Sequence, residues 1–263
     1  MTPFSRTETF TVLNISLAIS SVSDASKRLI DLAEKNTSGY VCAPSVHTVM
    51  LAQQSPELAQ ALNNSLMNCP DGRPLSWVGR IQGYSDAEQV RGPDLMLEIC
   101  KSSVPKELRH FLYGGKSGVA EKLKKGLEER FPGIKIVGTC NPPFRPLDEV
   151  ETARLRNTLK EVRPHFIWVG LGTPKQDLFC AKHAHDFGAG IMIAVGAAFD
   201  FHSGQLADSP AWVRKAGLQW LHRLIQEPRR LWKRYLLLNP LFIFCVTKEL
   251  FQKYISRKRA PRK

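Results

Sequence analysis

The chain has 263 residues, of which 43% are hydrophobic and 23% are charged. These proportions are typical of a soluble globular protein with a sizeable core. The formal net charge is +13, and residues 214–263 account for nearly all of it, with 14 Lys and Arg against 2 acidic residues. Such a tail indicates a polyanionic partner, either nucleic acid or an anionic membrane surface. Its longest apolar run, "LLLNPLFIFCV", is well short of the ~20 residues that span a bilayer, which excludes a transmembrane protein.

The apolar pattern of the first 212 residues predicts an α/β domain with a mainly parallel, Rossmann-like sheet flanked by helices. Strands are expected at 40–43, 111–113, 135–137, 166–169 and 191–195. Ser45 is a candidate cap for the helix after the first strand. A helix from about 117 to 130 separates the second and third strands, which makes one βαβ unit with parallel strands and a right-handed crossover. The last two strands are continuous apolar runs, as expected for strands buried on both faces.

Glycine-rich loops follow three of these strands. They are Gly114-Gly115, the segment from Gly170 through Gly172 and Lys175 to Gln176, and the segment from Gly196 to Asp200. Ligands of open parallel sheets bind beyond the carboxyl ends of the strands, and glycines there let backbone N–H groups approach a phosphate. Each loop alone could equally be a tight turn, because "GGKSG" is neither a GxGxxG nor a P-loop motif. Three such loops at one edge favour a nucleotide or nucleotide-sugar.

Asp71 lies in the sequence Pro-Asp-Gly. A turn-forming aspartate is the simpler interpretation of this spacing. The alternative is a general base that projects into the cleft.

The six cysteines form no CxxC pair, which indicates reduced, structural thiols. Cys180 and His183 have a metal-like local spacing without a second pair, so neither a metal site nor a cofactor is predicted.

Eight segments together resemble the WecG/TagA/CpsF glycosyltransferase family over roughly residues 10 to 240. In chain order they are "CPDGRPL", "VRGPDL", "FLYGGKSGVAEK", "FPGIKIVG", "VGLGTPKQD", "VGAAFDFHSG", "PAWVRKAGLQWLHRL" and "EPRRLWKRY". The resemblance implies a metal-independent, inverting transferase of bacterial surface or exopolysaccharide synthesis. Such an enzyme moves a sugar from a UDP-sugar to a polyprenyl-diphosphate-linked sugar, typically N-acetylmannosamine onto N-acetylglucosamine. It also implies that the chain is peripheral, at the cytoplasmic face of the inner membrane.

The resemblance assigns roles to individual residues. Asp71 corresponds to the proposed base that takes the proton of the acceptor hydroxyl. Arg91 would stabilise the departing diphosphate. The expected nucleotide-sugar-binding residues are Ser45, Gly114, Gly115, Gly172, Lys175, Gln176 and Asp200. For Asp200, a capping role is an equally ordinary explanation.

Two stretches depart from the family pattern. Where many members have threonine and asparagine after the first strand, this chain has Ala43 and Ser45, and His47 follows at a position that is often acidic. A hydroxyl cannot replace the two-sided hydrogen bonding of an amide, so glucose becomes a candidate sugar beside N-acetylmannosamine. In the second stretch, Asp208 stands where the family has an arginine.

Residues 213–263 are expected to form a basic, amphipathic, helical appendage that associates with the membrane. One helix should end near Gln226 and another should begin with Pro228 in its first turn. Arg223, Arg230 and Arg234 would bind the diphosphate of the lipid carrier, which suits guanidinium groups. Aromatic rings, the apolar run and the final basic residues would meet the interface and its anionic lipid. Packing of the same helices on the domain, with a solvated basic end, is the alternative.

Two other classes of protein compete with this interpretation. A nucleic-acid-binding protein would explain the basic tail, but its basic residues alternate with large aliphatic ones and no recognised binding motif is present. We therefore expect no nucleic acid partner. A nicotinamide-dependent oxidoreductase would explain the βαβ unit. However, "YGGKSG" is a poor match to the GxGxxG fingerprint, and Lys135 stands where an acidic residue is required.

Overall fold

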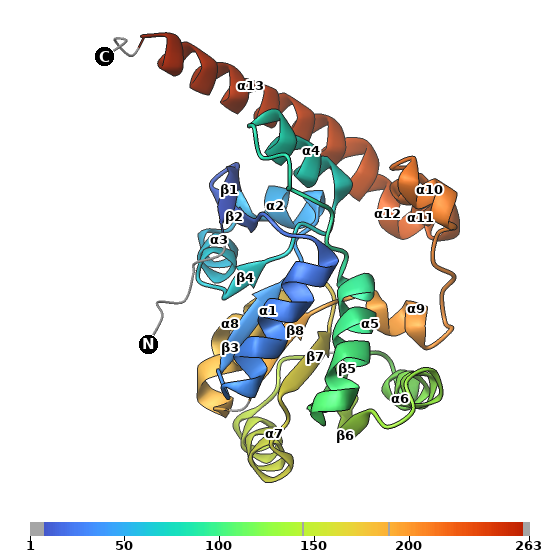
Figure 1. Ribbon diagram of the computed structural model, residues 1–263. Helices are drawn as coiled ribbons and strands as arrows, with labels where there is room; N and C mark the ends of the chain where they lie inside the picture. Colours follow the sequence, from blue (N-terminus) through green and yellow to red (C-terminus); the bar gives the residue numbers. More distant parts are fainter. Residues whose placement is uncertain (1–7, 144, 189, 260–263) are drawn as a thin grey trace.

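The computed structural model describes residues 8–143, 145–188 and 190–259. Its centre is a six-stranded parallel sheet in the order β4-β3-β8-β7-β5-β6 (Figure 1). The strands are β3 Gly39–Cys42, β4 Met67–Asn68, β5 Arg109–Gly114, β6 Lys135–Cys140, β7 Phe166–Gly170 and β8 Ile191–Ala194. All five predicted strands and the α/β class are confirmed. The two-residue strand β4 carries too short an apolar run to be recognised in the sequence.

Helices cover both faces of the sheet, because successive side chains of each strand point to opposite sides. Trp168 of β7 packs into one core, whereas Val169 packs into the other. One face carries α1 Val22–Glu34, α5 Gly92–Ser103, η1 Val104–Lys106, α6 Val119–Arg130 and α9 Ala198–His202. The other carries β1 Thr9–Val12, β2 Ile15–Ala18, α2 Val46–Ala52, α3 Pro56–Asn63, α4 Arg73–Ile81, α7 Glu149–Val162 and α8 Lys175–Phe187. The continuous apolar strands are therefore buried on both sides, as predicted.

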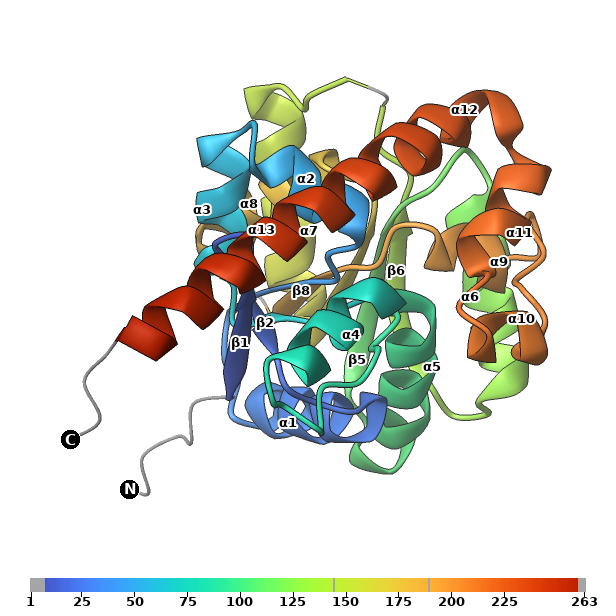
Figure 2. The same cartoon turned by 90° about the horizontal axis from the view of Figure 1, so that it is seen from above.

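The C-terminal appendage lies across one end of the domain (Figures 1 and 2). Its elements are α10 Ala211–Lys215, α11 Gln219–Gln226, α12 Pro228–Trp232, the π-helix η2 Lys233–Leu237 and α13 Leu238–Arg259. The break at Pro228 is confirmed, with proline in the first turn of α12. Since α10 crosses the proposed boundary at residues 212 and 213, that division of the chain stays a prediction. The final basic residues, from 260 on, lie outside the described residues.

Helix α13 rests on the domain through one face. Phe242 and Val246 are buried in the core beside α2. The Glu249 carboxylate accepts a hydrogen bond from the Leu13 N–H (3.0 Å) in the β1–β2 turn. Pro240 does not interrupt the helix; it is the third residue of α13, which continues directly from the π-helical turn η2. Among the helices of the described residues, none is both long and apolar enough to cross a bilayer.

Gly114, at the end of β5, has a packing role that a stability measurement can test. Its φ is +135°, and an added Cβ would lie 2.5 Å from the Gly170 carbonyl oxygen on the neighbouring strand. We expect Gly114→Ala to lower the free energy of unfolding by more than about 2 kcal/mol. Gly118→Ala is the matched control. Gly118 also has a positive φ, +78°, but nothing lies within 4 Å of an added Cβ, so we expect about 1 kcal/mol. Urea denaturation would measure both, and equal losses would contradict the packing role.

Candidate active site

A cleft of about 1080 Å³ lies where the carboxyl ends of the parallel strands meet the appendage. Nearly all of the predicted site residues line it, although no sequence-local pattern brings them together. They are Ser45, Asp71, Arg91, Gly115, Gly172, Lys175, Gln176, Asp200, Arg223, Arg230 and Arg234. Gly114 is not among the lining residues, because its place in β5 turns it toward Gly170 instead. The cleft therefore combines loops of the sheet edge with three arginines of the appendage.

Asp71 is held in the cleft by its backbone and by one carboxylate oxygen. It follows the short strand β4, and its N–H donates to the Pro44 carbonyl (3.0 Å), which ties it to the loop after β3. Gln89 Nε2 donates to the Asp71 carbonyl (2.7 Å). The Gly92 N–H, in the first turn of α5, donates to Asp71 Oδ1 (2.9 Å). The carboxylate thus bonds to a residue 21 positions away instead of closing a local turn, and Asp71 lines the cleft.

Burial raises the pKa of Asp71 above the ordinary value of an aspartate. The Gly92 N–H and the guanidinium groups of Arg91 and Arg234 oppose this effect, while Asp94 adds to it. A carboxylate with a raised pKa is a stronger proton acceptor than a solvated one. The site therefore suits proton abstraction.

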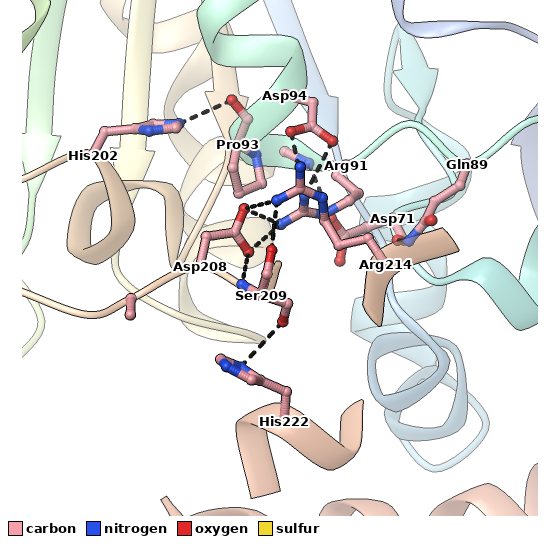
Figure 3. Close-up of polar contacts among 12 residues, drawn as sticks. Asp71, Gln89, Arg91, Pro93, Asp94, His202, Asp208, Ser209, Arg214 and His222 are labelled. Atoms are coloured by element: carbon pink, nitrogen blue, oxygen red, sulfur yellow. Dashed lines mark hydrogen bonds and ion pairs between the residues drawn. The ribbon is translucent and has the colours of Figure 1, made fainter. Parts of the chain in front are cut away.

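Arg91 is only 3% exposed, and its guanidinium is already engaged (Figure 3). Arg91 Nη2 donates to both carboxylate oxygens of Asp208 (2.8 and 3.0 Å), and Nη1 forms an ion pair with Asp94 (3.2 Å). Asp208 also accepts from Arg214 Nη1 (3.1 Å). The aspartate that departs from the family pattern therefore links α5 to the start of the appendage. Stabilisation of a leaving diphosphate by Arg91 stays a prediction.

Gln176 supports two glycine loops from its position in the first turn of α8. It is buried, and its Oε1 accepts from the Gly172 N–H (3.1 Å). An added Cβ on Gly196 would lie 3.2 Å from the same oxygen. The amide therefore fixes the loops after β7 and β8 relative to each other. Lys175, the preceding residue, adds a positive charge to the cleft.

Asp200 faces the appendage. Burial raises its pKa, and the nearby Arg223 and Arg230 guanidinium groups oppose this effect. Both arginines also form ion pairs with Glu227, which follows α11. Arg223 lies over the ring of Phe201, 5.2 Å from its centroid. Asp200 thus contributes to holding two cations of the appendage at the mouth of the cleft.

Arg234 projects from the π-helix η2 to the loop after β3. Its Nη2 donates to Ser45 Oγ (3.0 Å), and the Ser45 side chain also caps α2 through the Thr48 N–H. The capping role predicted for Ser45 is confirmed. π-Helical turns often occur at functional sites. Here the turn carries a guanidinium close enough to Asp71 to lower the pKa of that carboxyl.

His47 lines the same cleft and was not assigned a role from the sequence. Burial, together with the positive charge of Arg234, lowers its pKa to about 4. The imidazole is therefore neutral at physiological pH and presents a hydrogen-bonding group to the cleft instead of a charge. Two signals in the sequence point to it: its position two residues after Ser45, in the first turn of a helix at the sheet edge, and its departure from a family position that is often acidic.

Cys180 and His183 lie on the buried side of α8. The His183 ring stacks on Phe187, with 4.9 Å between the ring centroids. Among the described residues, no group of three or more His, Cys, Asp or Glu side chains is arranged to hold a metal ion. The pair with metal-like spacing is thus accommodated in the core.

The fold and the cleft define an α/β protein of the Rossmann-like type with a cleft at the carboxyl edge of its sheet, where open parallel sheets bind their ligands. The profile of the glycosyl transferase WecG/TagA/CpsF family matches residues 10–256, and the chain belongs to this family.

Curated relatives in two Bacillus species have the same name, N-acetylglucosaminyldiphosphoundecaprenol N-acetyl-beta-D-mannosaminyltransferase. The relative from Bacillus subtilis strain 168 is 28% identical over 230 residues, which cover 84% of this chain and 85% of the relative. The relative from Bacillus spizizenii is 26% identical over 215 residues, which cover 82% and 81%. This chain is thus similar to both over most of their length.

Proposed function

We propose that this glycosyltransferase moves a hexose or N-acetylhexosamine from a UDP-sugar to a polyprenyl-diphosphate-linked sugar. Bacterial surface or exopolysaccharide synthesis is the setting, at the cytoplasmic face of the inner membrane. The activity for which the relatives are named supports the acceptor class. The observation that carries the proposal is the cleft in which Asp71 meets basic residues from the sheet edge and the appendage. Two anionic groups, the donor diphosphate and the acceptor diphosphate, would otherwise repel each other there.

The chemistry is a single displacement with inversion at the anomeric carbon. Asp71 accepts the proton of the acceptor hydroxyl as the oxygen attacks that carbon. The bond between the carbon and the donor diphosphate breaks, and its electron pair leaves with UDP. Lys175, at the glycine-rich edge of the cleft, would bind the donor diphosphate as it gains charge. Arg223, Arg230 and Arg234 would bind the diphosphate of the acceptor.

The side chains around Ser45 affect which sugar the cleft can bind. The Ser45 hydroxyl is already bonded to Thr48 and Arg234, and His47 beside it is neutral. The hydroxyl at position 45 cannot make the two-sided hydrogen bonds that an amide there could make to an N-acetyl group. Glucose and N-acetylmannosamine are therefore both candidate sugars.

A transfer assay tests the proposal. Purified protein would be mixed with detergent-dispersed polyprenyl-diphosphate acceptors that carry either N-acetylglucosamine or glucose, and with a series of UDP-sugars. We expect UDP release that requires both a donor and an acceptor, because a single displacement has no covalent enzyme intermediate. The productive pair would identify the sugar. If no pair releases UDP above the rate without acceptor, the proposed reaction is wrong.

A further inference from the structure

Helix α4 presents an apolar face that the proposed reaction does not use. Trp77, Ile81 and Tyr84 are 48%, 70% and 40% exposed. The spacing of four places Trp77 and Ile81 on one side of α4, and Tyr84 follows the turn after the helix. The opposite side, with Leu75 and Val78, is buried in the core. Large exposed side chains that gather on one face indicate an interaction surface.

This face continues onto the appendage. The Trp77 indole lies beside Gly217, in the turn between α10 and α11, where an added Cβ would be 3.3 Å from the ring. Beyond that turn, Leu221 and Ile225 of α11 are exposed. Figures 1 and 2 show α4 and α10–α13 at the same end of the molecule.

Helix α13 has an exposed apolar face of its own. Phe244 and Phe251 are exposed and, at 100° per residue, point away from the buried Phe242 and Val246. The domain therefore covers one side of α13 and leaves a second apolar strip at the end of the molecule that also bears α4.

The positive charge around the exposed face of α4 indicates what kind of partner that face binds. The segment from residue 72 to residue 85 contains Arg73 and Arg80 and no acidic residue, although Asp86 and Glu88 follow it. The appendage beside it carries most of the net charge of the chain. Indole and aliphatic side chains among guanidinium groups are the composition of helices that lie in a bilayer interface beside anionic lipid. A protein partner would require no such excess of positive charge.

We propose that α4 is a second membrane contact, built into the catalytic domain, which together with the appendage seats the protein on an anionic bilayer. This inference rests on the proposed function, because a lipid-linked acceptor must enter the cleft from the bilayer. Helix α4 begins at Arg73, two residues after Asp71. Its insertion therefore fixes the distance between the proposed base and the lipid surface, where the acceptor diphosphate lies.

Vesicle flotation tests the inference without any substrate, so its outcome does not depend on whether the transfer reaction is correct. Full-length protein would be mixed with vesicles of equal parts phosphatidylcholine and phosphatidylglycerol. We expect Ile81→Ser to weaken partitioning about tenfold and Ile81→Trp to strengthen it. Val150→Ser is the matched control, because Val150 is 71% exposed on α7, at the opposite end of the molecule (Figure 1). It should bind vesicles like the parent protein.

Two results would overturn the inference. One is equal vesicle binding by the parent protein and both Ile81 variants, which would assign the membrane contact to the appendage alone. The other is a concentration-dependent dimer in sedimentation experiments that Ile81→Ser abolishes, which would make the α4 face a contact between two copies of the chain. Thermal unfolding of Ile81→Ser, a substitution at a solvent-exposed position, would show whether weaker binding reflects loss of the fold.

Discussion

Replacing Asp71 with asparagine is expected to lower kcat by about 10²–10⁴-fold, the usual contribution of a general base. Asparagine has the same shape, and its side-chain oxygen can still accept the Gly92 N–H that Asp71 Oδ1 accepts now. The fold and the binding of both substrates should therefore persist, with little change in KM. Only proton abstraction is lost, because an amide cannot take the proton of the acceptor hydroxyl. Steady-state UDP release with a saturating acceptor would measure the effect.

Asp94→Asn is the matched control for this substitution. Asp94 is another carboxylate close to Arg91, but it is not among the residues that line the cleft. It should change kcat by no more than a few-fold, since Arg91 keeps its two bonds to Asp208. A loss as large as that of Asp71→Asn would mean that the cleft depends on the charge network around Arg91. Full activity of Asp71→Asn would show that another group takes the proton.

The sequence was sufficient for the features that depend on neighbouring residues. The apolar runs located the five longer strands of the sheet, Ser45 was recognised as a helix cap, and Pro228 marked the break between α11 and α12. Each of these is decided by steric or hydrogen-bonding preferences within a few positions along the chain. The glycine loops were placed at one edge because parallel strands share their direction.

Features that depend on distant residues could not be obtained in this way. Arg91 and Asp208 are 117 positions apart, and nothing in either segment indicates that they pair. Arg234 reaches Ser45 across 189 positions, from a π-helical turn that has no recognisable sequence pattern. Gly114 is required by the close approach of Gly170, a steric reason for glycine that the sequence alone does not reveal. Whether the appendage reaches the cleft is decided by such tertiary contacts.

Arg234 is the residue of the appendage whose loss should alter the chemistry at Asp71. Its guanidinium lowers the pKa of Asp71, which burial raises. Asp71 must be ionised to act as a base, so activity is lost as the pH falls through its pKa. Removing the positive charge in Arg234→Gln raises that pKa further. We therefore expect the acid limb of the pH profile of kcat/KM to move to higher pH. The value of kcat/KM should also fall about 10–100-fold, because a charge-assisted contact to the acceptor diphosphate is lost.

Arg229→Gln separates this local effect from a general loss of positive charge. Arg229 lies on α12 next to Arg230, but it is exposed and is not among the residues that line the cleft. With a short-chain acceptor that needs no membrane, the Arg229 variant should keep both kcat/KM and its acid limb. If the Arg234 variant loses activity while its acid limb stays in place, Arg234 binds the acceptor without acting on Asp71. If both variants shift alike, the field of the whole appendage sets the pKa of Asp71, and the π-helical turn has no special part in it.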